Sequence, residues 1–360
     1  MFLQRTIIIS VIISILLLNL FNSVKAEEKL FVIRQKGKIG YINSSGKIVI
    51  KPQFVMGSDF SEDLAKVKVN NKIGYIDKTG KFAIKPQFDK GDDFSEGLAV
   101  IVLLTKFGYI DKKGNMAIIP KFDYAGSFYE GLAIVNVKGK FGYINKAGDF
   151  VIEPEFDMIG PFSDGLARMV KDNKHGYIDK TGKIIIKPQF PMASDFSEGL
   201  ACIMSGDKCG YIDKTGKTII KPQYPMASDF SEGLAGVKSG DKYGFIDKSG
   251  KLAIKPQFDF ASNFSEGLAG VKSGDKYGFV DKSGKVVIKP QFNESGMFSE
   301  GIARVKSGDK YGFIDKSGNL IIKPEFDFAN WNFPDGLALV IKGKKMAYID
   351  KTGKYIWKEE

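Results

Sequence analysis

A block of 34 residues recurs along almost the whole chain. Its clearest copy is 242–258, KYGFIDKSGKLAIKPQF, whose glycine returns once in every block. Nine matching glycines lie at Gly40, Gly74, Gly108, Gly142, Gly176, Gly210, Gly244, Gly278 and Gly312, and an irregular tenth copy surrounds Ala347. Each unit of such an array buries apolar surface only against its neighbours. The repeat therefore predicts one elongated or curved body rather than the two or three globular domains that length alone would indicate.

Each unit carries the signals of three antiparallel strands. In the copy that starts at Leu234, we expect strands over 234–238, 242–247 and 251–258. Gly240 lies between the first two strands and Gly250 closes the second turn, and glycine accepts the positive φ angles of tight hairpins. Pro256 cannot donate to a hydrogen-bond ladder, so the third strand is predicted at a sheet edge. The remaining segment, 259–267, is expected to be a returning loop.

Strand pairing predicts how the units stack. If Ser239 lies opposite Lys242, both faces of the sheet carry apolar side chains, so each sheet should stack on the next at about 10 Å. We therefore predict an all-β fold in which about ten three-stranded meanders stack as an open β-superhelix. A closed propeller-like ring is the alternative. The ring is disfavoured for two reasons. No spare strand remains at one end of the chain to complete the sheet at the other end, and about 34 residues is short for a four-stranded blade.

The N-terminus has the pattern of an export signal. Arg5 precedes an apolar stretch over 6–21, and Val24-Lys25-Ala26 places an apolar and a small residue before a cleavage point. We predict that residues 1–26 are a removed signal peptide and that 27–360 form the repeat domain. An uncleaved anchor is the alternative, although the stretch is shorter than the ~20 residues that span a bilayer. The mature chain would then be secreted or periplasmic, without a transmembrane segment.

Composition argues against several kinds of chemistry. The formal charge of +11, from 53 basic and 42 acidic residues, permits attraction to an anionic surface but does not require nucleic acid. His175 is the only histidine, so a Ser-His-Asp triad, a transition-metal site and a bound cofactor are not expected. The acids of the Ser-Glu-Gly corners, from Glu62 to Glu300, form a ladder rather than one pair around a cleft. We predict no catalytic residues and no enzyme.

Two irregular places differ from the repeat. Cys202 and Cys209 flank one turn on a diagonal; we favour two unpaired thiols, and a disulfide is the alternative that an export compartment would allow. The insertion Asn330-Trp331-Asn332 breaks the register once and adds one of the two tryptophans. These three residues are the candidate interaction site, since an exposed loop aromatic can contact a glycan or a protein. Alternatively, Trp331 caps the end of the array, as does Trp357.

The repeated motifs resemble a known family. The units Lys-x-Gly-Tyr-Ile-Asp-Lys-Thr/Ser-Gly-Lys, Ile-Lys-Pro-Gln-Phe and Phe-Ser-Glu-Gly-Leu-Ala are similar to bacterial WG repeats, also called KWG repeats, over 30–357. The resemblance implies an often exported protein whose repeats are binding or interaction modules without a defined reaction. The naming tryptophan is replaced in turn by Ile39, Ile73, Phe107, Phe141, His175, Cys209, Tyr243, Tyr277 and Tyr311. We call this position the slot, and its apolar and aromatic residues suggest packing between units.

The function that we expect is an exported, non-enzymatic repeat scaffold. Its partner would be a protein or a cell-envelope polymer, held by many weak and similar contacts that add through multivalency. A polysaccharide-active enzyme and a purely structural surface component are the alternatives. The enzyme would need one cleft with paired acids, and the structural component would have no specific ligand.

Overall fold

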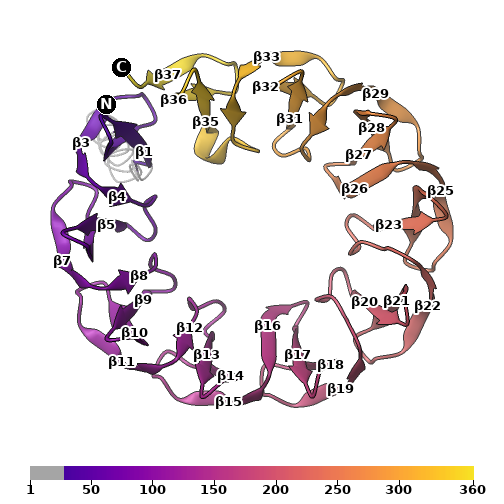
Figure 1. Ribbon diagram of the computed structural model, residues 1–360, viewed down its shortest axis with the longest axis horizontal. Helices are drawn as coiled ribbons and strands as arrows, with labels where there is room; N and C mark the ends of the chain where they lie inside the picture. The colour runs from indigo at the N-terminus through magenta and orange to yellow at the C-terminus, as the bar shows by residue number, and fades with distance from the viewer. Residues whose placement is uncertain (1–27) are drawn as a thin grey trace, which may run out of the picture.

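The computed structural model describes residues 28–360, so the predicted signal peptide lies outside the described residues. These residues form ten small antiparallel sheets arranged in a closed ring, as Figure 1 shows. We number the sheets blades 1 to 10 in chain order. Within 28–360 no helix has the length and apolar character needed to cross a membrane.

Three strands of every blade follow the prediction closely. The second strands of the blades are β1 Leu30–Gln35, β5 Ala65–Val69, β9 Leu98–Leu103, β13 Ala133–Val137, β17 Leu166–Lys171, β20 Leu200–Ser205, β23 Leu234–Ser239, β27 Leu268–Ser273, β31 Ile302–Ser307 and β35 Leu337–Lys342. The third strands are β2 Lys38–Asn43, β6 Lys72–Ile76, β10 Lys106–Asp111, β14 Lys140–Ile144, β18 Lys174–Ile178, β21 Lys208–Asp213, β24 Lys242–Asp247, β28 Lys276–Asp281, β32 Lys310–Asp315 and β36 Lys345–Asp350.

The outer strands carry the repeated proline at the ring's edge, as expected. They are β3 Ile48–Phe54, β7 Phe82–Phe88, β11 Met116–Phe122, β15 Phe150–Phe156, β19 Ile184–Phe190, β22 Thr218–Tyr224, β25 Leu252–Phe258, β29 Val286–Phe292, β33 Leu320–Phe326 and β37 Tyr355–Lys358; the last lacks the proline. The predicted register is also confirmed, because Ser239 pairs with Lys242 and Ala235 with Ile246.

The segment predicted to be a returning loop is instead the fourth, innermost strand of most blades. It forms β4 Met56–Gly57, β8 Lys90–Gly91, β12 Tyr124–Ala125, β16 Met158–Ser163, β26 Phe260–Ser265, β30 Glu294–Ser295 and β34 Phe328–Ala329, and the one-turn helix η1 Pro334–Gly336 follows β34. In blades 6 and 7 single bridges at Ala193 and Ala227 take its place. We call this stretch the inner segment. Four strands fit into 34 residues because the inner strand is mostly two residues long.

The predicted open superhelix is wrong, because blade 1 packs on blade 10. Phe31, Ile33 and Ile42 share an apolar cluster with Leu337, Tyr348 and Trp357, and the Tyr348 hydroxyl donates to the Val32 carbonyl at 2.9 Å. We call this junction the seam. Face-to-face packing closes the ring, so no strand that laces the ends together is needed.

The seam repeats an ordinary contact between blades. Elsewhere the glycine of the turn before each outer strand packs on an isoleucine of the preceding blade, for example Gly284 on Ile254. Across the seam, Gly46 of blade 1 also contacts an isoleucine of blade 10, but the nearest atom there is the backbone carbonyl oxygen of Ile356. Trp357 is therefore buried at the seam and does not cap an open end.

An aromatic pair joins each of the other nine pairs of neighbouring blades. A tyrosine or phenylalanine of the third strand meets a phenylalanine of the next inner segment, with ring centroids 4.7 to 5.0 Å apart. Offset and edge-on pairs at this spacing are favourable. Seven of the nine phenylalanines in these pairs are buried, and the apolar clusters run from each blade into the next.

The repeated strand glycine is required by a close approach of backbone. A Cβ atom at Gly278 would lie 2.3 Å from the Ile288 carbonyl oxygen and 2.6 Å from the Pro290 nitrogen of the outer strand. The pairing of β28 with β29 shifts register between Tyr277 and Phe279, across this glycine, where the outer strand passes close to it. Any side chain would push the two strands apart.

Candidate functional site

The inner segments define the two faces of the ring. Successive antiparallel strands turn at alternate ends, so the Ser-Glu-Gly corners and the glycine turns before the outer strands lie at one face. The hairpins between second and third strands, such as Asn70-Asn71, lie at the other, next to the start of each inner segment. We call these the corner face and the hairpin face.

A chain of carboxylates links the blades at the corner face. The Glu96 side chain, for example, accepts a hydrogen bond from the Gly131 N–H at 3.0 Å and pairs with Lys146 at 3.0 Å, both in the next blade. The Lys146 ammonium is the main reason why the pKa of Glu96 is lowered. The lysines come from the turns after the third strands. These corner glutamates therefore bind the next blade through a glycine N–H and a lysine ammonium.

The hairpin face presents an exposed apolar band. The first strand residue of the inner segment, or its equivalent, is a methionine or an aromatic residue in seven of the nine inner segments that the structure describes. These residues are Met56, Tyr124, Met158, Met192, Met226, Phe260 and Phe328, each 40 to 58% exposed. We call them, with the slot residues of the same face, the rim band. Lys90 and Glu294 occupy the two remaining positions.

Slot aromatics make the rim band continuous over two arcs. Phe260 lies 6.0 Å from Tyr243 of blade 7 and 6.1 Å from Tyr277 of blade 8, measured between ring centroids. Tyr124 bridges Phe107 and Phe141 in the same way, at 5.6 and 6.4 Å. Lysines cover some of these rings, with Lys272 Nζ 5.7 Å from the Tyr277 centroid. The arc over blades 7 to 9 is therefore both aromatic and basic.

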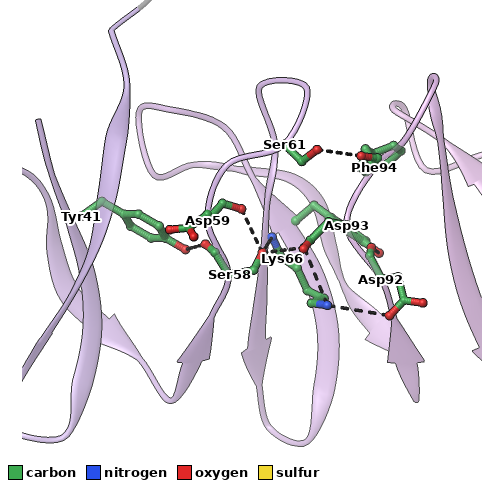
Figure 2. A network of polar contacts seen from close by, with 9 residues as sticks. Tyr41, Ser58, Asp59, Ser61, Lys66, Asp92, Asp93 and Phe94 are labelled. Atoms are coloured by element: carbon green, nitrogen blue, oxygen red, sulfur yellow. Dashed lines mark hydrogen bonds and ion pairs between the residues drawn. The ribbon is translucent and has the colours of Figure 1, made fainter. Parts of the chain in front are cut away.

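A polar network connects the inner segments of blades 2 and 3 (Figure 2). The Ser58 hydroxyl donates to Asp93 at 2.6 Å, and the Lys66 ammonium lies 3.7 Å from the same carboxylate. Tyr41 of blade 1 donates to the Ser58 carbonyl at 2.8 Å, and the Ser61 hydroxyl donates to the Phe94 carbonyl at 2.7 Å. These bonds fix the inner edge of each blade to its neighbour.

A pocket of ≈ 340 Å³ lies at the seam. It is lined by Asp59, Asp335, Asn330 and Tyr348 among others, and the Asp335 carboxylate forms an ion pair with Lys29. Desolvation and the nearby Asp93 raise the pKa of Asp59, and a hydrogen bond from the Val32 N–H opposes this shift. The seam pocket thus brings several carboxylate side chains, among them Asp59 and Asp335, around one cavity.

The structure divides the three residues predicted as an interaction site. Asn330 lines the seam pocket, whereas Trp331 and Asn332 line a separate pocket of ≈ 370 Å³ with Met297. One face of Trp331 stacks on Arg304 of blade 9, 3.4 Å from the ring centroid, and the side chain stays 59% exposed. Trp331 therefore lies on the preceding blade and remains accessible, and its predicted role as an interaction residue stays a prediction.

The other singled-out side chains lie within blade interfaces. His175 is half-buried, and its Nδ1 lies 3.2 Å from Arg168 Nη1; burial and this guanidinium lower the pKa of the imidazole. Cys202 and Cys209 are buried, unpaired thiols, and burial raises the pKa of the Cys202 thiol. Between residues 28 and 360, no three or more His, Cys, Asp or Glu side chains gather to hold a metal ion.

Sequence reasoning missed the rim band. Its signal was present, because a methionine or an aromatic residue recurs just after the Pro-Gln-Phe stretch. The position looked like part of a loop, and only the register of the inner strand shows that it faces solvent beside the slot residue.

Ten radially arranged four-stranded or nearly four-stranded sheets define the class of β-propellers. The model of the WG containing repeat matches nine segments, 39–72, 73–103, 107–141, 141–174, 176–209, 210–243, 243–277, 277–311 and 311–345. The chain thus belongs to the WG-repeat family, as its motifs indicated. No curated protein sequence matches it.

Solved structures are similar to this chain at low sequence identity. A structure described as the eukaryotic initiation factor superposes with a TM-score of 0.55 at 12% identity, covering 93% of this chain and 96% of that one. Kluyveromyces lactis Hsv2p gives 0.36 at 13% identity over 54% and 74% of the two chains, and the dihydro-heme d1 dehydrogenase NirN gives 0.39 at 11% over 92% and 73%. The first likeness supports the propeller fold alone.

Proposed function

We propose that the protein is an exported, non-enzymatic scaffold that binds a partner protein through the rim band. The observation that carries this proposal is the recurrence of an exposed methionine or aromatic residue at one position of seven inner segments. Contiguous exposed apolar surface on a soluble domain marks interaction sites.

The chemistry of the band favours a protein over a polymer. Methionine is flexible and polarisable and suits surfaces that adapt to apolar side chains. Aromatic residues and arginine are enriched where proteins meet. Lys238 and Lys272 beside the slot tyrosines favour a partner with acidic groups around an apolar centre. Similar contacts on neighbouring blades would strengthen binding through multivalency.

The test uses the mature chain, 27–360, immobilised and offered solubilised cell-envelope proteins and, separately, envelope glycans. We expect one protein to be retained, to be identifiable by mass spectrometry, and to bind again as a purified component. The variant Tyr124→Gln/Met226→Gln/Phe260→Gln should weaken its binding by roughly 10-fold or more, since central contacts at interfaces often exceed 1 kcal/mol each.

The control variant is Leu252→Gln/Val287→Gln/Leu320→Gln. These side chains are 38 to 50% exposed on outer strands, away from the band, and should leave affinity unchanged. Equal loss in both variants, retention of glycans alone, or no specific ligand would contradict the proposal; the last outcome would favour a purely structural component.

A second candidate is hydrolysis of an envelope polysaccharide at the seam pocket. It is favoured by Asp59, whose pKa is raised, beside Asp335 in the same concavity. A carboxyl group with a raised pKa is suited to act as a general acid. Turnover of purified glycans that disappears in Asp59→Asn would establish this activity. Glycans that stay intact would exclude it.

A further inference from the structure

Four sulfur-containing side chains line one pocket between blades 6 and 7. Cys202, Cys209, Met192 and Met204 all border a cavity of ≈ 400 Å³. Met204 pairs directly with Cys209, and its N–H donates to the Met192 carbonyl at 2.9 Å. Directly opposed residues of an antiparallel sheet project from the same face. Met192, Met204 and Cys209 therefore form a row, and Cys202 lies on the adjacent diagonal.

The two thiols border the same pocket. Cys202 and Cys209 lie on adjacent strands of blade 6, offset by one diagonal position, and the Cys202 thiol donates to the Ile203 carbonyl at 4.0 Å. The Asp229 carboxylate of blade 7 borders the same pocket and adds negative charge. Both cysteines and both methionines thus converge on one space beside an acid.

The other blades place different chemistry at these positions. Blade 7 carries Gly236, Lys238 and Tyr243 at these positions. Blade 8 carries Gly270, Lys272 and Tyr277. In those blades the lysine ammonium covers the tyrosine ring, at 5.9 and 5.7 Å from its centroid. Blade 6 replaces all three residues with sulfur side chains at once. The equivalent pocket of blade 7 is bordered by Gly236 and Tyr243, whereas in blade 6 the three replacements and Met192 line the pocket with sulfur atoms.

We propose that these four side chains bind a single Cu(I) ion. Thiolate and thioether ligands are soft and select Cu(I) over harder cations. On binding, Cu–S bonds form to Cys202 and Cys209 and the two thiol protons leave to solvent, so no electron is transferred. Met192 and Met204 offer neutral thioether donors to the same ion. Zn(II) fits poorly, because its sites use cysteine, histidine and carboxylate ligands, usually four or with water completing three.

The test titrates Cu(I) into reduced chain 27–360 under anaerobic conditions, with a chromophoric Cu(I) chelator as competitor. We expect one equivalent to be retained per chain. In the variant Cys202→Gly/Cys209→Tyr, retention should fall by roughly 100-fold or more, since even outer-shell changes cost about 10–100-fold. This variant copies the residues of blade 7, so circular dichroism should show an unchanged fold.

Met56→Lys is the matched control, since blade 3 carries lysine at that position and Met56 lies outside the pocket. Its Cu(I) retention should equal that of the parent chain. With methyl-labelled methionine, the NMR signals of Met192 and Met204 should shift on addition of Cu(I), whereas that of Met158 should not.

Three results would overturn the proposal. The first is Cu(I) retention that is no stronger in the parent than in the double cysteine variant. The second is equal competition by Zn(II), which would remove the preference for a soft ion. The third is a native Cys202–Cys209 disulfide that mild reductant does not open, since both ligands would then be consumed.

Discussion

Outside the seam, one aromatic residue of each third strand makes the same contact with the next blade around the ring, but its side chain is tyrosine in some blades and phenylalanine in others. Tyr211, for example, pairs with Phe230 and donates its hydroxyl to the Ser228 carbonyl at 2.6 Å. At three interfaces the residue is phenylalanine, and the ring pair is kept without the hydrogen bond, as for Phe245 and Phe264 at 4.8 Å. The stacked rings are therefore the common element, and the hydroxyl is an addition.

This contrast predicts a reciprocal pair of substitutions. Tyr211→Phe should lower the free energy of unfolding by about 1 kcal/mol, because one buried hydrogen bond is lost. Phe245→Tyr should raise it by up to about 1 kcal/mol if the new hydroxyl reaches the Ser262 carbonyl. Urea denaturation of both variants measures the difference. Two changes of the same sign would contradict the assigned role of the hydroxyl.

The raised pKa of Asp59 predicts how the stability of the fold depends on pH. Its pKa is raised, so ionisation costs the folded state free energy at neutral pH. Asp59→Asn keeps an acceptor for the Val32 N–H and should stabilise the fold by about 0.5 kcal/mol or less, because the side chain is exposed and screened. The gain should vanish as pH falls below the ordinary aspartate pKa of 3.8.

Thermal unfolding of Asp59→Asn from neutral to acid pH checks this sign. Asp229→Asn, at the corresponding position of blade 7 and outside the seam pocket, is the control. A stabilisation that grew toward acid pH would mean that Asp59 is held in its charged form instead.

At the scale of the element, local sequence signals were enough to predict three strands of each blade, but they did not predict the inner strand. The hairpin glycines, the Asp247 turn and the edge proline each constrain the backbone by themselves. The Asp247 carboxylate accepts hydrogen bonds from the N–H groups of Ser249 and Lys251 and so fixes this turn locally. The inner segment has no alternating pattern, because Phe264 points to the neighbouring blade while Ser265 bonds to the Phe298 carbonyl. Its strand pairing depends on contacts with the neighbouring blade.

The turn before each outer strand predicts a graded effect of substitution. Gly284 has φ of +85° and its added Cβ would lie 3.1 Å from Ile254 of the preceding blade, whereas Gly267 has the same φ and open space. Gly267→Ala should cost about 1 kcal/mol of stability from backbone strain alone. Gly284→Ala should cost more, about 2–3 kcal/mol, since the blade contact is also displaced. Equal losses in urea denaturation would show that the blade contact does not matter.

At the scale of the whole molecule, the sequence did not distinguish an open β-superhelix from a closed ring. The choice depends on the angle between neighbouring blades, which many small side-chain contacts set together. The seam residues Phe31 and Tyr348 are ordinary aromatics in sequence, and nothing local marks them as partners 5.6 Å apart. The candidate site was equally hidden, because the rim band is assembled from one side chain per blade.

Closure changes the expected effect of deleting one unit. Removing 234–267 keeps nine intact blades but requires each interface to open to a wider angle. We expect the seam to be lost, with a lower thermal midpoint and a larger radius in X-ray scattering. A circular permutant that joins 360 to 28 and begins at Asp207 keeps ten blades and should match the parent. An equally compact and stable nine-unit protein would contradict a fixed wedge angle.

The seam differs from every other interface because the chain does not run across it. Its contacts include side-chain packing, the Tyr348 hydroxyl bond, the hydrogen bond from the Gln35 amide to Glu360 and the ion pair of Lys29 with Asp335. Parting blade 1 from blade 10 therefore breaks no strand ladder. Separating the two ends at the seam would turn the ring into an open arc of ten intact blades.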